Sequence, residues 1–274
     1  MDAALAGLLQ VGLAAAGAPL VVGAIRTLKA RLVGRRGPSV LQPYADLRKL
    51  LGKEPVISAT TSWIFRATPW IQAATALVAA MLVPLVLTRP ALAPAGNIIL
   101  VMSLFMLATF FLALAGLDAG SAFGGRGSSR AVAVAALAEP TVILAVFALA
   151  LRARTSDLGG IVERLAAQPS LVLAPGHLLA FAAFFIVTLA ETGRLPVDNP
   201  ATHLELTMIH EAMVLEYSGH HLALVEWAGA MKLFLFLALV ETSVAKLRLF
   251  RVPELLAGSF ALGVLSVTSA FVLP

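Results

Sequence analysis

The stretch Ile98–Leu117, IILVMSLFMLATFFLALAGL, decides the fold, because it runs for twenty residues without one charged side chain. A helix of about 20 apolar residues is long enough to cross the hydrocarbon core of a bilayer. Comparable apolar segments lie at residues 3–25, 69–88, 131–151, 171–191, 222–245 and 254–273. The sequence therefore predicts an all-α, polytopic membrane protein of about seven transmembrane helices, with residues 1–274 forming a single integral membrane domain.

Composition supports this fold class. Of the 274 residues, 59% are hydrophobic and 13% are charged, whereas soluble domains have roughly 45–50% apolar and about 25% charged residues. The chain has no cysteine, which excludes disulfides, thiolate metal sites and cysteine-ligated iron–sulfur clusters within it. We therefore expect any redox metal to belong to a partner subunit.

The cations indicate an orientation in the membrane. Between Arg26 and Thr68 lie nine of the 20 basic residues, namely Arg26, Lys29, Arg31, Arg35, Arg36, Arg48, Lys49, Lys53 and Arg66. Cytoplasmic loops carry an excess of Lys and Arg, so this loop is predicted to be cytoplasmic. Within it, Tyr44–Leu51 has apolar and charged residues on opposite sides, which predicts an amphipathic helix at the membrane surface. The pattern fits lipid anchoring and docking of a soluble partner equally well.

Two segments need a separate interpretation. A single crossing by residues 222–245 would put the basic residues Lys246, Arg248 and Arg251 outside, where such a cluster is disfavoured. Two short or re-entrant helices would return the chain to the cytoplasm, which leaves eight crossings or a re-entrant pair as the alternative to seven. The stretch Gly124–Gly127 lacks the Lys-Ser/Thr of a phosphate-binding loop, and we expect it to be a turn.

Some ionisable residues lie within or at the ends of the apolar segments, where a central charge costs roughly 2.5–3.5 kcal/mol. They are Asp118, Glu139, Glu191, Glu226, Lys232 and Glu241. Glu139 directly precedes Pro140, which frees a backbone carbonyl nearby, and its apolar surroundings favour a carboxyl that holds or passes a proton. Glu226 and Lys232 are about 600° of helical rotation apart, so a structural ion pair, interfacial positions and a functional role stay open for them.

The densest polar stretch is ETGRLPVDNPATHLELTMIHEAMVLEYSGHH, residues 191–221. It holds five carboxylates and four histidines, namely Glu191, Asp198, Glu205, Glu211, Glu216, His203, His210, His220 and His221. Apolar residues alternate with them, which predicts partial burial, and half-buried carboxylates and imidazoles are typical of a proton relay or a charge-sensing site. A metal held by His203, His210 and Glu211 is the alternative, although Val214 stands where the HExxH zinc pattern needs histidine.

Two loops carry a resemblance to a known family. RRGPSVLQPYADLRKLLGKE (residues 35–54) and ETGRLPVDNPATHLELTMIHEAMVLEYSG (residues 191–219) resemble the signature loops of the respiratory complex I ND1 superfamily. The second loop is most similar to that of the membrane subunit of hydrogenase-4 and formate-hydrogenlyase-type complexes. The resemblance extends to FLALAGLDAGSAFGGRGSSR (residues 111–130), the AEP at residues 138–140 and AKLRLFRVPELL (residues 245–256).

The resemblance implies about eight transmembrane helices and a membrane-anchoring, coupling subunit of a group 4 [NiFe]-hydrogenase (complex I-like) complex. Such a subunit links redox chemistry in a hydrophilic arm to proton or cation translocation. The implied partners are [NiFe]-hydrogenase-like large and small subunits and antiporter-like membrane subunits, with the [NiFe] centre and the iron–sulfur clusters in those partners. The chain would be a non-catalytic, multi-pass subunit of the cytoplasmic (inner) membrane that holds no cofactor or metal and binds no nucleic acid.

The resemblance also carries residue roles. It implies a proton path along the carboxylates Glu139, Glu191, Asp198, Glu205, Glu211 and Glu216. It implies a junction with the hydrophilic arm at Arg36, Asp46, Lys49 and Glu54.

This chain departs from the family near its C-terminus, and two other functions stay open. Family members usually have another hydrophobic helix between segments similar to LALVEWAGAMKLFLF and ALVETSVAKLRLF, whereas here the two segments run together. One alternative is the quinone-site, ND1-type subunit of a NADH-quinone oxidoreductase-like complex, which the HLELTMIHEAMVLEYSG stretch argues against. The other is a stand-alone ion transporter, for which we find no internal repeat.

Overall fold

The computed structural model describes residues 3–83, 97–167, 175–193, 197–198, 208–234, 259–265 and 267–268. Within these ranges the chain is helical and has no β-strand, apart from an isolated bridge between Asn97 and Asp157. The helices are α1 (Ala3–Leu32), α2 (Gln42–Leu51), α3 (Trp63–Leu82), α4 (Ile98–Asp118), α5 (Ala122–Ala153), α6 (Leu158–Ala167), α7 (Pro175–Glu191), α8 (His210–Val214) and α9 (Gly219–Leu233). The predicted all-α class is confirmed for the described residues.

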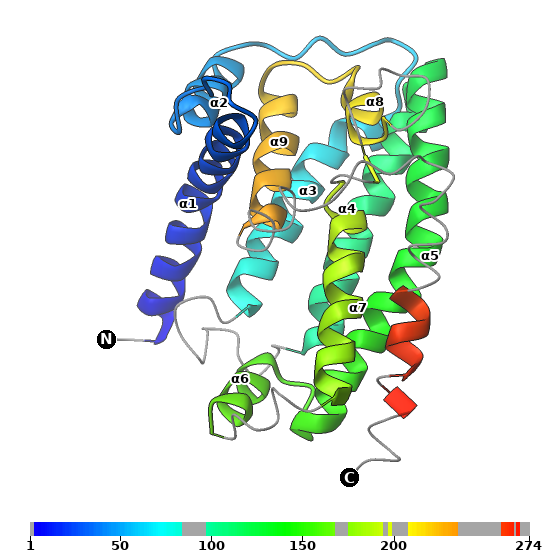
Figure 1. The fold of residues 1–274 in the computed structure, drawn as a ribbon. Coiled ribbons are helices and arrows are strands. Elements are labelled where there is room, and N and C mark those ends of the chain that lie inside the picture. The colour runs from blue at the N-terminus through cyan, green and yellow to red at the C-terminus, as the bar shows by residue number, and fades with distance from the viewer. Residues whose placement is uncertain are drawn as a thin grey trace.

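The long helices form one bundle, with short helices at its two ends (Figure 1). Helix α3 packs against α4 and α9, α5 packs against α4 and α7, and α1 packs against α9 and α3. Helices α2 and α8 and the first turn of α9 gather at one end, drawn at the top of Figure 1 and called the upper end below; α6 lies at the opposite end. The bundle therefore brings the first signature loop and the described part of the second, residues 208–219, to the same end.

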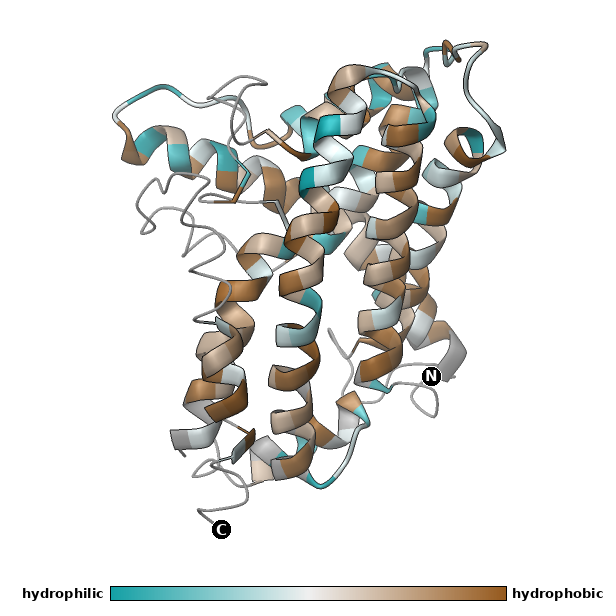
Figure 2. Ribbon diagram, turned by 90° about the vertical axis from the view of Figure 1, so that its right-hand side faces the viewer, coloured by the Kyte–Doolittle hydropathy of each residue, from teal (hydrophilic) through white to brown (hydrophobic). Residues whose placement is uncertain are grey.

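Among the residues that the structure describes, three helical segments are long and apolar enough to cross a membrane: Gly7–Leu32, Ile99–Asp118 and Ala122–Ala145. Hydrophobic residues make up most of the long helices in Figure 2, and hydrophilic residues are frequent at the upper end. The structure thus supports a membrane protein, while the number of seven spans stays a prediction. The junction of the two C-terminal segments at residues 235–258, with Lys246 and its neighbouring arginines, lies outside the described residues.

Two boundaries differ from the sequence prediction. Helix α1 continues to Leu32, so Arg26, Lys29 and Arg31 lie on its last turns rather than in a loop. The expected turn at Gly124–Gly127 is wrong, because these residues lie inside α5.

Close helix packing explains these glycines. A Cβ on Gly127 would lie 2.9 Å from the Cβ of Ala212, and one on Gly116 of α4 would lie 2.4 Å from Ser128 Oγ of α5. Side chains larger than hydrogen would push α4, α5 and α8 apart. Of the three glycines that suggested a turn, Gly124 and Gly127 are therefore needed where helices cross at short range, whereas a Cβ on Gly125 would meet no atom within 4 Å.

Polar side chains inside the bundle bind backbone carbonyls of neighbouring helices. Gln10 Nε2 donates to Ala80 O at 3.0 Å, and Gln72 Nε2 donates to Ala108 O at 2.7 Å. Both glutamines are buried, and a buried amide without partners would cost several kcal/mol in an apolar environment, on the order of 2–7 kcal/mol. These bonds fix α1 on α3 and α3 on α4.

Asp118 has a structural role as well. Its Oδ2 accepts the backbone N–H groups of Ser62 at 2.8 Å and Phe65 at 3.3 Å. The first turn of a helix has unpaired N–H groups that favour a negative charge, so Asp118 at the end of α4 caps α3. Next to this cap, Tyr217 stacks on the ring of Phe65 and donates from its hydroxyl to Phe65 O at 2.8 Å.

The amphipathic helix predicted over Tyr44–Leu51 is confirmed as α2. It begins two residues earlier, with Pro43 in its first turn, where proline is favoured because it has no N–H to leave unpaired. The Tyr44 hydroxyl donates to Ala16 O of α1, and α2 also packs against α9. Helix α2 is therefore anchored to the upper part of the bundle.

Candidate functional site: a charged cavity inside the bundle

A cavity of about 1060 Å³ lies inside the bundle and is lined by residues of α1, α2, α3, α4, α5, α7, α8 and α9. Apolar residues such as Leu112, Val134 and Val225 form much of its wall. The ionisable side chains that line it are Arg26, Lys29, Asp46, Glu191, Asp198, His210, Glu211, Glu226 and Lys232. So many titratable groups in one apolar-walled cavity are typical of a functional site.

His210 and Glu226 form one charged pair in this cavity. The distance from His210 Nε2 to Glu226 Oε1 is 3.8 Å, and the side chains are 36% and 41% exposed. Burial alone would lower the pKa of His210, but the charge of Glu226, with smaller effects of Asp198 and Glu211, outweighs it and raises the pKa. His210 is thus protonated more readily than an ordinary histidine, because Glu226 lies beside it.

A second charged group lies deeper in the bundle. Lys232, near the end of α9, interacts electrostatically with Glu191 at the end of α7, and its Nζ lies 3.5 Å from Thr109 Oγ1 of α4. Glu191 in turn is within electrostatic range of Glu139 on α5. Three helices therefore bring two carboxylates and an ammonium group together where α5, α7 and α9 meet.

Asp198 holds the segment between these groups in place. It is 4% exposed, and its two carboxylate oxygens accept the backbone N–H groups of Ile209 at 3.1 Å and His210 at 2.8 Å. These bonds fix the start of α8, from which His210 and Glu211 reach the cavity. Asp198 therefore positions other site residues and also lines the cavity itself.

The six predicted path residues are not all in one place. Glu191, Asp198 and Glu211 line the cavity, and Glu139 lies close to Glu191. Glu216 is exposed and does not line the cavity, and Glu205 lies outside the described residues.

The four predicted junction residues lie at or near the upper end. Asp46 of α2 lines the large cavity, whereas Arg36 lines a separate, smaller cavity. Lys49 and Glu54 are exposed. The four residues therefore lie at the upper end, with Asp46 in the part of the large cavity wall that α2 forms.

Sequence reasoning missed some cavity residues. The spacing of Glu226 and Lys232 does not place them on one helix face, yet both line the cavity. Arg26 and Lys29 were expected in a loop, and Thr109 lies in the apolar segment that decided the fold. The signal that could have identified Thr109 and Gln72 is a polar side chain inside an otherwise apolar membrane helix.

The metal alternative finds no support in the part of the chain that is described. There, no three His, Asp or Glu side chains gather as a metal site. His203, the third residue of the proposed set, lies outside the described residues.

Curated proteins similar to this chain include two from Escherichia coli (strain K12). Formate hydrogenlyase subunit 4 is 35% identical over 215 residues, which covers 78% of this chain and 69% of the relative. Hydrogenase-4 component C is 36% identical over 214 residues, covering 78% and 66%. A NADH-quinone oxidoreductase subunit of Syntrophotalea carbinolica is 34% identical, covering 74% and 64%. The chain thus spans about two thirds of the length of these relatives.

The fold is also similar to a solved structure. A chain in the structure of the membrane-bound sulfane sulfur reductase, an archaeal respiratory membrane complex, matches with a TM-score of 0.72 and 23% identity, over 100% of this chain and 91% of that chain. The family model described as NADH dehydrogenase matches residues 5–247. This match spans most of the sequence and includes both signature loops, so the chain belongs to the NADH dehydrogenase family, within which the ND1 subunits of complex I and the hydrogenlyase membrane subunits are its relatives.

Proposed function

We propose that this chain is the membrane-anchoring and coupling subunit of a group 4 [NiFe]-hydrogenase complex of the complex I type. In this role it links redox chemistry in a hydrophilic arm to proton or cation movement in the membrane. The observation that carries the proposal is the charged cavity, which extends from the upper end of the bundle to the meeting point of α5, α7 and α9. The formate hydrogenlyase and hydrogenase-4 relatives favour the hydrogenase version of the family.

The order of the charged groups suits a coupling path. The pair His210–Glu226 lies closer to the upper end than Lys232, which follows Glu226 by six residues, or about 9 Å of helix. Glu191 and Glu139 continue the series beside Lys232. A charge change at the upper end would therefore alter the proton affinity of the first pair and, through electrostatics, of the deeper carboxylates. Helix α8, held by Asp198, would carry this change into the cavity.

The same arrangement supports an orientation. Of the described cations, Lys29, Arg31, Arg48, Lys53, Arg66 and Arg126 lie at the upper end, on the last turns of α1, on α2 and its loop, and on the first turns of α3 and α5. The positive-inside rule then makes the upper end cytoplasmic. We propose a multi-pass chain of the cytoplasmic membrane, with seven crossings by sequence and eight by family analogy, formed as one integral domain.

The proposed partners follow from this orientation. A [NiFe]-hydrogenase-like large and small subunit would dock on the upper end near Arg36, Asp46, Lys49 and Glu54, and would carry the [NiFe] centre and the iron–sulfur clusters. Antiporter-like subunits would pack against the bundle within the membrane. Affinity purification of the tagged chain tests this assignment: the expected result is copurification of both kinds of subunit, and a stable, partnerless oligomer would contradict it.

The coupling role is tested by neutralising carboxylates in the cavity and beside it without changing their shape. Glu191→Gln and Glu139→Gln are expected to leave the complex assembled and its hydrogen chemistry intact, while reducing the ion movement that accompanies each turnover. Glu205→Gln tests the third predicted position in the same way. The matched control is Glu163→Gln, an exposed carboxylate on α6 at the opposite end. The measurement is ion uptake per hydrogen formed in liposomes containing the purified complex, and unchanged ratios in the Glu139 and Glu191 variants would refute the path.

A quinone-site subunit is the second candidate function, and one observation favours it. The cavity has apolar walls as well as charged groups, which suits a ligand with a polar head and an apolar ring. Quinone-dependent turnover of the complex, blocked by quinone-site inhibitors, would replace the hydrogenase assignment with this one.

A further inference from the structure

The basic end of α1 forms a cavity of its own. After Leu32 the chain reverses at Gly34, whose φ of 73° is in the left-handed region, and Arg35 N donates to Ala30 O at 2.8 Å. The following loop, Arg35–Val40, returns alongside the last turns of α1. Between this loop and the helix is a cavity of about 430 Å³, lined by Thr27, Arg31, Arg35, Arg36, Gly37, Pro38, Ser39 and Val40.

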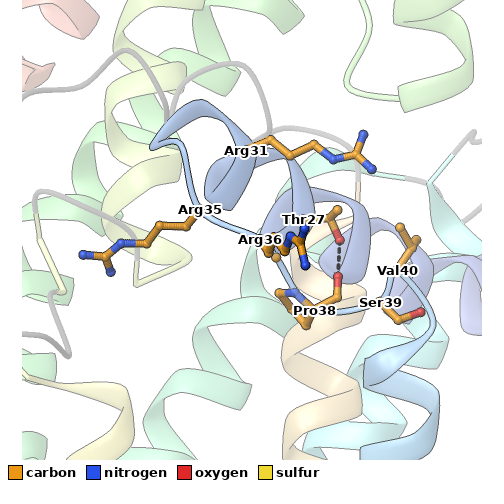
Figure 3. Close-up of a pocket in the computed structure, with 8 residues that line it drawn as sticks. Thr27, Arg31, Arg35, Arg36, Pro38, Ser39 and Val40 are labelled. Atoms are coloured by element: carbon orange, nitrogen blue, oxygen red, sulfur yellow. Dashed lines mark hydrogen bonds between the residues drawn. The ribbon is translucent and has the colours of Figure 1, made fainter.

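Specific contacts hold this loop against the helix. Thr27 Oγ1 donates to Pro38 O at 2.9 Å, the bond drawn in Figure 3. A Cβ on Gly37 would lie 2.9 Å from the Cβ of Ala30, and one on Gly23 would overlap Val40 O. The cavity is therefore a built part of the fold, shaped before any ligand arrives.

The charge around this cavity is unbalanced. Arg31, Arg35 and Arg36 are exposed, and Figure 3 shows Arg31 and Arg35 pointing away from each other, with Arg36 between them beside Thr27. Residues 3–45 contain no Asp or Glu, and within the described chain no ion pair joins these arginines to an acid. The three guanidinium groups are spread over a surface. Arginine binds a phosphate group through two parallel hydrogen bonds, so this surface is suited to phosphate groups.

An apolar surface leads up to these arginines. On the outer face of α1, Leu20, Leu28 and Leu32 are 43%, 45% and 61% exposed, and their spacing places them on one face with Arg31. From Leu20 to Arg31 is about 16 Å of helix, which matches roughly 15 Å for one leaflet of a 30 Å hydrocarbon core. The helix thus presents a surface for one acyl chain below a cavity for a headgroup.

We propose that this end of α1 is a binding site for an anionic phospholipid of the leaflet at the upper end. The headgroup lies in the cavity at the Arg35–Val40 loop, with Arg31 on one side and Arg35 on the other, and an acyl chain lies along Leu28 and Leu20. Basic clusters next to a transmembrane helix attract anionic lipids, with a contribution of about 1 kcal/mol per Lys or Arg. The proposal requires only that α1 spans the membrane, and it does not depend on the hydrogenase assignment or on coupling.

The positive-inside rule alone does not require such a site, because orienting charges act at any position in the loop. The test therefore compares two pairs of cations from the same end of the molecule. Arg31→Gln with Arg35→Gln removes two cations from the cavity and leaves Arg36, the predicted junction residue, in place. The matched control, Arg48→Gln with Lys53→Gln, removes the same charge from α2 and the loop after it.

The measurement is native mass spectrometry of the purified full chain in neutral detergent, titrated with phosphatidylglycerol or with phosphatidylcholine of the same acyl chains. The wild type and the control pair are expected to retain phosphatidylglycerol in preference to phosphatidylcholine. The Arg31/Arg35 pair is expected to bind phosphatidylglycerol about thirtyfold more weakly, since each cation contributes roughly fivefold. Circular dichroism checks that the helices are intact. A single Arg35→Lys variant keeps the charge and retains Arg31, and it is expected to bind phosphatidylglycerol nearly as well as the wild type.

Three outcomes would overturn the proposal. The first is equal loss of phosphatidylglycerol in both pairs, which would indicate diffuse attraction by net charge. The second is equal retention of the two lipids by the wild type. The third is displacement of the lipid by inorganic phosphate at similar concentration, which would make the cavity a site for a free oxyanion. Failure of the coupling experiments on Glu139 and Glu191 would leave this proposal unaffected.

Discussion

Two roles are open for Asp198: it positions the start of α8, or it carries a proton. The variant Asp198→Asn distinguishes these two roles. Asparagine has nearly the same shape, but its amide has one acceptor oxygen, so one of the two N–H groups at the start of α8 loses its partner. The aspartate is 4% exposed, and the bonds that it accepts are 3.1 and 2.8 Å long. Water is therefore a poor substitute for the lost oxygen.

The magnitude follows from these contacts. A hydrogen bond to a charged group contributes about 1.5–3 kcal/mol, and we expect the free energy for local opening of α8 to fall by that amount. This corresponds to roughly ten- to hundredfold faster hydrogen exchange at the amides of Ile209 and His210. Exchange at the helices away from α8 is expected to change little, because the loss is local.

The assay is hydrogen–deuterium exchange of the purified chain, read by mass spectrometry on peptides that contain residues 208–214. Asp157→Asn is the matched control, since Asp157 Oδ2 also accepts a backbone N–H, that of Gly160 at 2.7 Å, at the other end of the bundle. It should leave the α8 peptides unchanged. If Asp198→Asn abolished coupled ion movement while α8 exchanged at the wild-type rate, the positioning argument would be refuted and direct proton transfer favoured.

Three further predictions use other contacts. Gly116→Ala should lower the free energy of unfolding by about 1–3 kcal/mol through overpacking. Gly125→Ala, with no atom within 4 Å of the new Cβ, should change the free energy of unfolding by under about 0.5 kcal/mol. Thermal unfolding measures both. Asp118→Ala should cost about 1–2 kcal/mol by removing the cap of α3, measured in the same way. His210 has a pKa above its ordinary value of 6.5, so its pairing with Glu226 stabilises the fold fully below pH 6.5 and is lost as the pH rises through the raised value; Glu226→Gln should remove that pH dependence of the melting temperature.

Each of these has a clear contrary result. Equal melting temperatures for the two glycine variants would show that the helix contact adjusts without cost. A fully stable Asp118→Ala protein would mean that other groups satisfy the first turn of α3. A pH profile that is unchanged by Glu226→Gln would assign the titration to a group other than His210.

The fold was predictable to the extent that it depends on periodicity and length. Predominantly apolar runs of helical length predict α1, α3, α4, α5 and α7, because backbone groups in an apolar environment must bond within their own segment. The amphipathic pattern at Tyr44–Leu51 predicted α2 for the same local reason. The turn expected at Gly124–Gly127 failed because glycine serves tight helix contacts as well as turns, and only the neighbour, here Ser128 or Ala212, distinguishes the two uses.

The candidate site was predictable only in part. Carboxylates such as Glu191 and Asp198 stood out because charge is rare in this chain. Their partners did not stand out: His210 meets Glu226 from another helix, and Lys232 meets Glu191 across the bundle. Sequence spacing describes one helix at a time, so it does not predict a cavity whose wall comes from eight helices.

By itself, the sequence determined that the protein is helical and apolar, that nine of its 20 cations lie between Arg26 and Thr68, and that it carries two family loops, because these properties are local in the chain. Tertiary structure decided which scarce polar groups act together. It turned Asp118 into a helix cap, placed Asp198 under the start of α8, and combined His210, Glu226, Lys232 and Glu191 in one cavity. The physical reason is that hydrogen bonds and charge interactions act over a few ångströms, and only packing of the helices brings residues far apart in the chain to that distance.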